Sequence, residues 1–450
     1  MSNHQSNGNH LQSNILKKFF RIANHSKSII KSFYKTPRYN DEPLLYQYNA
    51  LINLNNKPND KNTDANEWGG GASFNQKKAM LKALGEGFER YCIGTYNKSD
   101  LLISPINTIK DLILDPRNIN TFSSTQKIHK DFSKFFFDES ASFQWIKGYL
   151  LGQNKKCWIP AQLVYIPYNF DDEPIIQFPI TTGAALGTSL ENAIVRGICE
   201  IIERDSFMIH YLNKISPFKI DLLHSGKKYK DIYIYFQRYN LELMIFDLTI
   251  DLVPIFMAII LDKTGTGPAI SIGLKCSFSI KEAILGAIEE AQQSRPWLRD
   301  QYASVNKKDL QILVKNKTKI DTPLSRGLYW YDGRLLNSLN FWLKSNKSKR
   351  IKIPSKEKGM FSSKKQLQKI YTLLNKKGYK IYYVDITQNE IKKEKFFVVK
   401  VIIPDLIPLY LIEAYPYLGN RRLLEIPKSM GIIATKLTES NLNTIPHPFL

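Results

Sequence analysis

Apolar residues recur along the chain with two periods, and together they predict a mixture of strands and helices. Alternating or continuous apolar runs predict strands over 44–54, 143–151, 156–168, 217–222, 241–247, 254–261, 269–275, 379–386 and 396–403. Helical spacing predicts helices over 14–34, 229–239, 279–295 and 363–377, the last of them ended by Gly378. Residues 1–12 are polar and are expected to be disordered. This order of elements indicates an α/β (α+β) fold with mixed sheets.

One further predicted helix, within residues 182–205, carries charge inside an otherwise apolar sequence. Glu200 and Glu203 are three residues apart, which places both on one helix face, and Arg204 follows them. A buried carboxylate is costly unless a positive group meets it. Two interpretations are open at this point. Either these charges form an ordinary salt bridge on a solvated face, or a metal ion supplies the positive charge that Arg204 does not.

The same arrangement returns twice in the chain. A glycine-rich segment leads into a helix with two acids and an arginine, Glu86, Glu89 and Arg90, and the helix over 279–295 carries Glu290, Gln293 and Arg295. Mg²⁺ prefers oxygen ligands and usually holds phosphate between itself and carboxylates. Glycine turns allow a backbone to approach an anion closely. The three segments therefore predict a site for Mg²⁺ and phosphate, provided that they converge in space.

Other catalytic templates are absent from the sequence. It contains no GxxxxGK[ST], no GxGxxG before a helix, no HExxH, no CxxC and no GxSxG. His210 lies one helical turn after Ser206, which is the spacing of a Ser–His pair. A histidine in the core or on a helix surface is the favoured interpretation of that pair.

Composition adds a strong positive charge to this description. The 450 residues carry a formal net charge of +22, mostly from lysine, which favours a partner that is acidic: nucleotide phosphates, an acidic peptide or nucleic acid. No nucleic-acid motif accompanies the charge, so nucleic acid is not the expected partner, and lysine usage in an A+T-rich genome is the alternative explanation. Four separated cysteines indicate reduced core residues of a cytoplasmic protein. No apolar run is long enough to span a membrane.

The three acidic segments resemble the motifs of the YcaO superfamily. Residues 82–90 are similar to its SxxxExxER motif, 198–205 to ExxERD, and 288–295 to ExxQ followed by Ser-Arg. The resemblance covers about residues 69–295 and implies a YcaO-type fold whose acidic helices converge on ATP and Mg²⁺. It implies that the metal ligands are Glu86, Glu89, Glu200, Glu203 and Glu290. The implied nucleotide contacts are Lys82, Glu86, Arg90, Glu200, Arg204, Gln293 and Arg295.

The sequence departs from the family pattern in its first motif. Gly69-Gly70-Gly71 stands where members often have Gly-Lys-Gly, and Lys82 stands where they often have Ser. Lys82 lies one turn before Glu86 on the same helix face. We therefore hypothesise that Lys82 supplies the cation that Gly70 lacks.

The end of the sequence indicates the branch of the family. Pro446-His-Pro448-Phe-Leu450 resembles the PxPxP tail of members that form azolines, with Leu in the last position. The resemblance implies that Pro446, Pro448 and Leu450 act near the active site; a disordered tail is the alternative. The implied function is ATP-dependent cyclodehydration of Cys, Ser or Thr in a ribosomally made precursor peptide, as in bacteriocin biosynthesis, through phosphorylation of the backbone amide oxygen. Thioamide formation with a sulfur-delivery partner, and a non-catalytic ATP-binding scaffold, are the alternatives.

The expected organisation is a basic N-terminal extension over 1–40, a YcaO catalytic domain over 41–440 and a proline-containing tail over 441–450. No leader-peptide-binding domain is recognisable in the sequence. The expected partners are therefore the precursor peptide and a separate leader-binding protein, either ubiquitin-activating-like or a docking protein. A flavin dehydrogenase and a second copy of the chain are the further partners considered.

Overall fold

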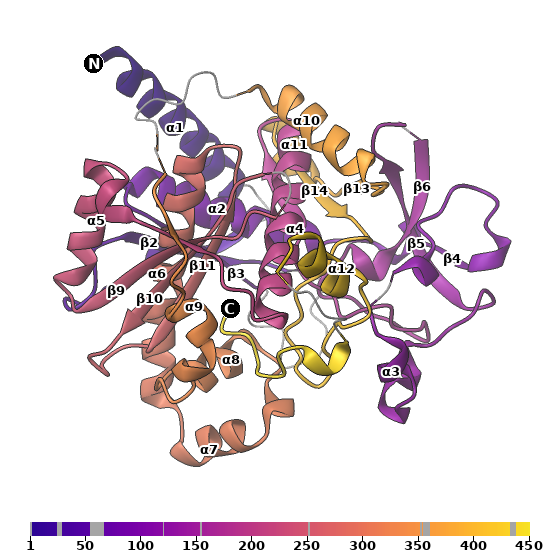
Figure 1. Ribbon diagram of the computed structural model, residues 1–450. Coiled ribbons are helices and arrows are strands. Elements are labelled where there is room, and N and C mark those ends of the chain that lie inside the picture. The colour runs from indigo at the N-terminus through magenta and orange to yellow at the C-terminus, as the bar shows by residue number, and fades with distance from the viewer. Residues whose placement is uncertain are drawn as a thin grey trace. The chain divides into compact units, whose positions relative to one another are not determined.

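The structure is a computed structural model that describes residues 2–24, 29–54, 67–119, 121–153, 155–250, 253–351, 353, 361–432 and 438–450, with the side chains of 2–11 excluded. Contacts divide the chain into two compact units (Figure 1). The first unit contains residues 1–36, 46–201 and 361–406, and the second contains 37–45, 202–360 and 407–450. These units cut across the predicted boundaries at residues 40 and 440. Both contain helices and sheets, so the fold is the predicted mixture of α and β structure.

The first unit begins with a small antiparallel sheet in the order β1-β2-β3, formed by Ile30–Lys35, Tyr46–Ile52 and Trp68–Ser73. The helix α2 (Gln76–Ile93) packs on this sheet, and α1 (Ser2–Ala23) packs on α2. The Phe19 ring meets the Phe88 ring edge to face, with centroids 5.2 Å apart. Asn75 caps α2 by accepting a hydrogen bond from the Lys78 N–H. These contacts fix the direction in which α2 carries its acids.

A six-stranded sheet completes the first unit. Its order is β4-β5-β13-β14-β7, with β6 also paired to β5. The strands are β4 (Leu102–Pro105), β5 (Ser142–Leu150), β6 (Lys155–Pro160), β7 (Ala184–Gly187), β13 (Tyr382–Asp385) and β14 (Phe397–Ile402). The accompanying helices are α3 (Ser124–Lys127), α10 (Ser363–Lys376) and α11 (Asn389–Lys393). The edge strand β7 leads directly into α4 (Leu190–Leu212), whose last residues belong to the second unit.

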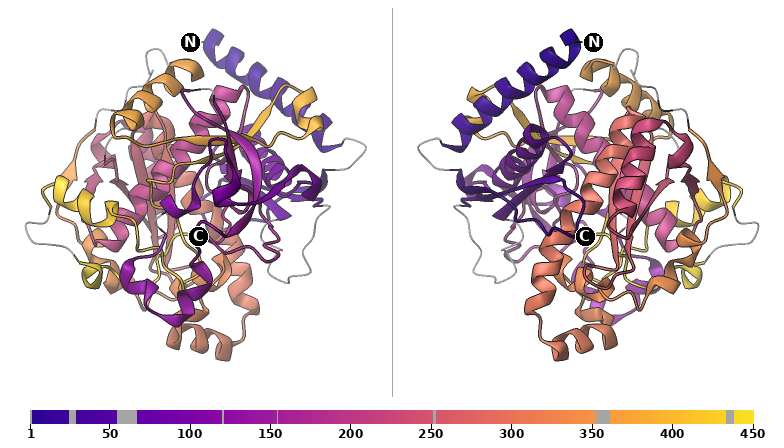
Figure 2. Two further views of the ribbon diagram at one scale, coloured as in Figure 1. Left: turned by 90° about the vertical axis from the view of Figure 1, so that its right-hand side faces the viewer. Right: turned by 90° about the vertical axis from the view of Figure 1, so that its left-hand side faces the viewer.

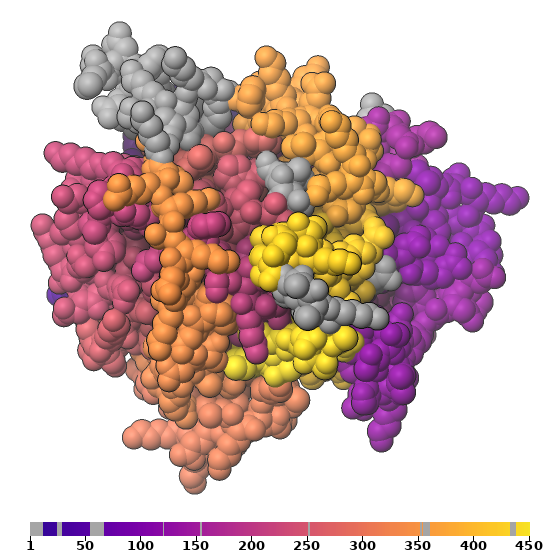
Figure 3. All heavy atoms as spheres, in the orientation of Figure 1, coloured from indigo at the N-terminus to yellow at the C-terminus, as the bar shows by residue number. Residues whose placement is uncertain are grey.

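The second unit is built on a five-stranded sheet in the order β11-β10-β9-β8-β12. Its strands are β8 (Phe218–Ile220), β9 (Leu241–Asp247), β10 (Ile255–Asp262), β11 (Ile270–Cys276) and β12 (Ser348–Lys349). The long α6 (Ile280–Ser304) packs along β10 and β11 (Figure 2). The other helices are α5 (Lys227–Gln237), α7 (Lys307–Lys315), α8 (Pro323–Trp330), α9 (Asn340–Leu343) and α12 (Arg422–Ser429). No residue of α7 is buried, and this helix stands at the surface (Figure 3).

Most predicted elements are confirmed, and three predictions are wrong. The helix predicted over 14–34 ends at Ala23, and residues 30–35 form β1 instead. The apolar residues there fit a helical period and a strand period equally well, and hydrogen bonding to β2 selects the strand. Residues 2–12, which the sequence predicts to be disordered, form the first part of α1. Once a helix has formed, each added residue contributes one more backbone hydrogen bond, so the helix can extend into a polar segment. The strand predicted over 156–168 ends at Pro160, and residues 161–163 form a turn of 3₁₀ helix. No helix in the described part of the chain is long and apolar enough to cross a membrane.

Glycines in three strands allow the acidic helices to approach the sheets. A Cβ atom on Gly71 of β3 would lie 2.4 Å from the Ala79 carbonyl oxygen of α2. A Cβ on Gly187 of β7 would lie 2.3 Å from the Ala193 nitrogen of α4, and one on Gly273 of β11 would lie 2.2 Å from an α6 carbonyl oxygen. No side chain fits there without moving backbone. These three glycines therefore allow the backbone of each strand to lie directly against the backbone of its helix.

Candidate functional site

In the first unit, backbone N–H groups of neighbouring segments hold the two carboxylates of α2. The Gly70 N–H donates to Glu86 Oε2 at 3.0 Å, and the Leu186 N–H donates to Glu89 Oε1 at 2.6 Å. Arg90 Nη2 donates to the other oxygen of Glu86 at 3.0 Å. Hydrogen bonds from backbone and from arginine fix both side chains, so α2, β3 and β7 together set the positions of these oxygens.

The acid that α4 contributes to the first unit is held in the same way. The Gly183 N–H donates to Glu200 Oε2 at 3.2 Å. Lys400 of β14 clamps the turn that contains Gly183, because its Nζ donates to the Ile180 and Thr182 carbonyl oxygens at 2.6 Å each. Burial lowers the pKa of Lys400 to about 7, and the charge of Glu200 opposes that shift. The sequence analysis missed Lys400, although a single lysine inside the apolar strand 397–402 was a visible signal.

The three acids of the first unit lie close enough to influence one another. Burial raises the pKa of Glu89 to about 7; the charge of Arg196 opposes this, while the charges of Glu86 and Glu200 add to it. Arg196 also donates to the Leu186 carbonyl oxygen at 2.8 Å. A carboxylate disfavoured by burial and by like charges is one that a bound cation stabilises. The first unit thus places Glu86 and Glu200 within electrostatic reach of Glu89, and the role of these three acids as metal ligands stays a prediction.

The second unit gathers the remaining predicted acids around Arg204. The Cys276 N–H donates to Glu203 Oε2 at 2.7 Å, and the Leu274 N–H donates to Glu290 Oε2 at 2.6 Å. Arg204 Nη1 donates to Glu203 Oε1 at 2.6 Å, and its Nη2 lies 3.8 Å from Glu290 Oε1. Burial raises the pKa of Glu290 to about 7, against the charge of Arg204. Strand β11 therefore orients an acid from α4 and an acid from α6.

The predicted metal ligands share one geometry. In each of the five, one carboxylate oxygen accepts a hydrogen bond from a backbone N–H of a strand or of the segment leading into one. A hydrogen bond at one oxygen orients the other oxygen of the same carboxylate. Among the described residues, no three His, Cys, Asp or Glu side chains are placed to hold a metal ion. Mg²⁺ is usually bound by one or two carboxylates together with substrate phosphates, so this set of oxygen donors fits it.

The predicted nucleotide contacts all stay predictions, and two of them, Lys82 and Gln293, lie on α2 and α6. Lys82 is exposed on α2, and its Nζ donates to the Ala72 carbonyl oxygen at 3.0 Å. That contact does not test whether Lys82 replaces the missing lysine of the first motif. Gln293 is half-buried on α6, three residues after Glu290.

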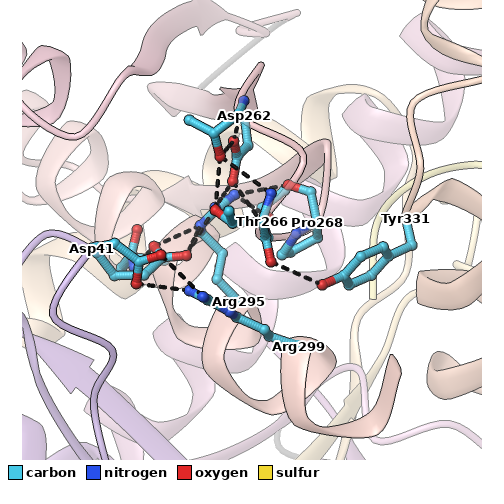
Figure 4. Close-up of polar contacts among 12 residues, drawn as sticks. Asp41, Asp262, Thr266, Pro268, Arg295, Arg299 and Tyr331 are labelled. Atoms are coloured by element: carbon cyan, nitrogen blue, oxygen red, sulfur yellow. Dashed lines mark hydrogen bonds and ion pairs between the residues drawn. The ribbon is translucent and has the colours of Figure 1, made fainter. Parts of the chain in front are cut away.

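The nucleotide contact predicted for Arg295 stays a prediction, and the structure buries its side chain fully among protein partners (Figure 4). Its Nε donates to Glu42 Oε2 at 2.8 Å, its Nη2 to Asp262 Oδ2 at 2.8 Å, and its Nη1 to the Pro268 carbonyl oxygen at 2.9 Å. Burial raises the pKa of Asp262, but hydrogen bonds from Thr264 and the charge of Arg295 hold it below its ordinary value. Arg295 therefore links segments inside the second unit.

The C-terminal tail is ordered by buried hydrogen bonds, which contradicts the alternative of a disordered tail. The Tyr211 hydroxyl and the Trp330 indole N–H each donate to the Pro446 carbonyl oxygen at 3.0 Å. Pro446 and Pro448 are buried and Leu450 is half-buried. The catalytic role predicted for these three residues stays a prediction.

Two polar residues of α4 belong to the core. His210 is buried, burial lowers its pKa to about 4, and its Nδ1 lies 2.8 Å from the Ser206 carbonyl oxygen. The favoured interpretation of a core histidine is therefore confirmed. Asp205 pairs with Arg422 Nη2 at 2.7 Å and accepts the Ile407 N–H. The sequence analysis did not identify Arg422 as the partner of this motif residue.

Comparison with known proteins supports this description. The family model described as "YcaO cyclodehydratase, ATP-ad Mg2+-binding" matches residues 70–407. An uncharacterised protein of Methanothermobacter thermautotrophicus is 26% identical over 231 residues, which are 50% of this chain and 56% of that protein. The chain thus spans just over half the length of this relative.

Solved structures show the same fold. A heterocyclase in complex with substrate and cofactor matches with a TM-score of 0.76 at 19% identity, over 96% of this chain and 57% of that one. The YcaO from Methanopyrus kandleri, bound with AMPPCP and Mg²⁺, matches with a TM-score of 0.63 at 14% identity, over 91% and 94% of the two chains. Because the family model matches most of the chain, the chain belongs to the YcaO family, which is described as binding ATP and Mg²⁺.

Proposed function

We propose that this chain is an ATP-dependent cyclodehydratase that converts Cys, Ser or Thr residues of a precursor peptide into thiazoline or oxazoline rings. The observation that supports the proposal is the shared geometry of Glu86, Glu89, Glu200, Glu203 and Glu290, each oriented by a backbone N–H. Five acids held in this way suit the binding of Mg²⁺ with phosphate. The description of the family as a cyclodehydratase is consistent with this reaction, and thioamide formation is the alternative that the experiment below separates from it.

The reaction that we propose has a simple balance. The peptide's side-chain thiol or hydroxyl attacks the preceding backbone carbonyl, and the resulting oxyanion takes the γ-phosphoryl group of ATP. Phosphate then leaves with the former carbonyl oxygen as the C=N bond of the ring forms, so the products are the azoline, ADP and phosphate.

The residues of this chain would act on charge and position. The oriented carboxylates would hold Mg²⁺, which would supply positive charge against the phosphates, and Arg90 and Arg204 would face the phosphate oxygens. Holding the attacking side chain against its own carbonyl lowers the entropic part of the barrier. Pro446, Pro448 and Leu450 are proposed to act at the peptide.

A partner that binds the peptide's leader segment forms part of the proposal. The net charge of +22 is suited to an acidic leader peptide or to phosphates, because charge of one sign steers an oppositely charged partner. A flavin dehydrogenase would oxidise the azoline products, and a second copy of the chain would form a homodimer; both remain proposals.

Mass spectrometry tests the reaction directly. The chain, a Cys/Ser/Thr-rich precursor peptide, its leader-binding partner and Mg–ATP are incubated, and the peptide mass is followed. Loss of one water per ring supports cyclodehydration. Replacement of oxygen by sulfur when a sulfur donor is added would instead show thioamide formation, and nucleotide binding without turnover would show a scaffold.

Matched variants separate the site from the fold. Glu203→Gln should abolish turnover and leave the fold intact, because the amide keeps its shape but loses its charge. Glu282→Gln, an exposed acid on α6, should turn over like the wild type. Equal activity of the two variants would remove Glu203 from the site.

A further inference from the structure

The penultimate residue of the chain lies against the arginine of the second acidic motif. The guanidinium carbon of Arg204 lies 4.3 Å from the centroid of the Phe449 ring. The Phe449 side chain is 2% exposed, and the Arg204 side chain is 11% exposed. The guanidinium carbon of Arg204 thus lies over an aromatic ring, while its Nη1 donates to Glu203.

The tail that carries Phe449 is fixed by several elements of the second unit. Tyr211 of α4 donates to the Ile445 carbonyl oxygen at 2.9 Å and also to that of Pro446. Arg326 Nη1 donates to the His447 carbonyl oxygen at 3.0 Å. Two prolines in five residues further restrict the backbone, since proline fixes φ. The Phe449 ring therefore has a defined place from which to act.

The contact with the Phe449 ring restricts the conformation of the Arg204 side chain. An arginine side chain has many rotamers, and it loses this conformational freedom when its guanidinium is held in one position. A ring packed against the guanidinium restricts its movement and, because a phenyl ring has no carboxylate or carbonyl oxygen, does not take up its N–H donors as those acceptors would. The attraction between a cation and an aromatic ring is also stronger where water is excluded, as it is around this buried ring.

We propose that Phe449 is a positioning residue for Arg204, so that the C-terminal tail acts on nucleotide through this arginine. The inference rests on the proposed function in one respect, namely that Arg204 faces nucleotide phosphates. It assigns to the tail a role that Pro446, Pro448 and Leu450 do not carry. Loss of the ring leaves Arg204 free to leave the plane in which it meets Glu203 and Glu290.

Direct binding of Mg²⁺ with a non-hydrolysable ATP analogue tests this role, because no peptide chemistry enters the measurement. Phe449→Leu should weaken the analogue by about tenfold, which corresponds to ~1.4 kcal/mol. Phe236→Leu is the matched control, since this fully buried ring lies in α5 and packs against Tyr235 of the same helix. The control should lower thermal stability and leave the affinity of the folded protein unchanged.

A double-mutant cycle distinguishes positioning from a general loss of structure. If Phe449 acts through Arg204, then Phe449→Leu should cost nothing further in an Arg204→Met background. Additive losses in the double variant, or a Phe449→Leu variant that binds like the wild type while Arg204→Met does not, would overturn the inference. Unchanged binding by Arg204→Met alone would instead remove Arg204 from the proposed nucleotide site.

Discussion

Replacing Arg295 by Met tests whether this motif residue stabilises the core of the second unit through its two buried ion pairs. The guanidinium lies between Glu42 and Asp262, whose side chains are 4% and 2% exposed. Arg295→Met keeps most of the volume and removes the charge, so it leaves two buried carboxylates without their cation. Breaking a buried pair by removing one partner costs about 3–5 kcal/mol.

The protonation equilibrium sets a limit on that cost. A buried carboxylate without its cation can take up a proton, and at about three pH units above its ordinary pKa this costs ~4 kcal/mol. We therefore expect Arg295→Met to lose about 4 kcal/mol of stability near pH 7. The carboxylate pKa in the folded variant would lie above the unfolded value, so the folded state binds the proton first as pH falls. The loss of unfolding free energy relative to the wild type should therefore be less than half as large at about pH 5 as it is near pH 7.

Guanidinium unfolding, followed by tryptophan fluorescence at both pH values, measures this loss. Arg299→Met is the matched control one turn later on α6: Arg299 pairs with Asp41, whose side chain is 49% exposed, and it should lose only about 1 kcal/mol. Arg295→Met should also bind the Mg–ATP analogue with unchanged affinity once folded. A variant of wild-type stability that binds nucleotide weakly would refute the stabilising role and support the predicted nucleotide contact.

Three further predictions concern the same framework. His210 has a folded pKa of about 4 against an unfolded value of about 6.5, so as pH falls the unfolded state is protonated first and stability is lost between these values. The wild type should therefore lose about 2 kcal/mol more than His210→Gln between pH 7 and pH 5 in urea unfolding, and equal losses would contradict the buried neutral ring. Lys400→Met frees two backbone carbonyls beside Gly183 and should weaken the Mg–ATP analogue about tenfold in calorimetry, while Lys263→Met, 72% exposed, should not. Gly273→Ala should lower the melting temperature because its Cβ would overlap the α6 backbone. Gly286→Ala is the control, since its Cβ would meet the side chain of Lys275 and not backbone. Equal destabilisation of the two variants would argue against the close contact at Gly273.

The sequence by itself determined the position of most helices and strands and the helix face on which each acid pair lies. Continuous apolar runs located β9, β10 and β11 to within a residue or two, because a strand buried on both faces is apolar along most of its length. Helical spacing located α10 equally well, because a half-buried helix repeats its apolar residues with its own period. The spacing of three between Glu86 and Glu89, and between Glu200 and Glu203, placed each pair on one helix face. Local geometry is sufficient for conclusions of this kind.

Only the tertiary structure decided what each charged residue meets. Arg204 and Arg295 both follow an acidic motif at short range, yet one lies against Phe449 and two acids, and the other is enclosed by Glu42 and Asp262. The partners of Arg295 are 253 and 33 residues away, and the tail lies far from α4 in the sequence. Sequence periodicity specifies the face on which a side chain lies. Its electrostatic environment depends on segments distant in the chain, and their approach is set by the packing of the whole unit.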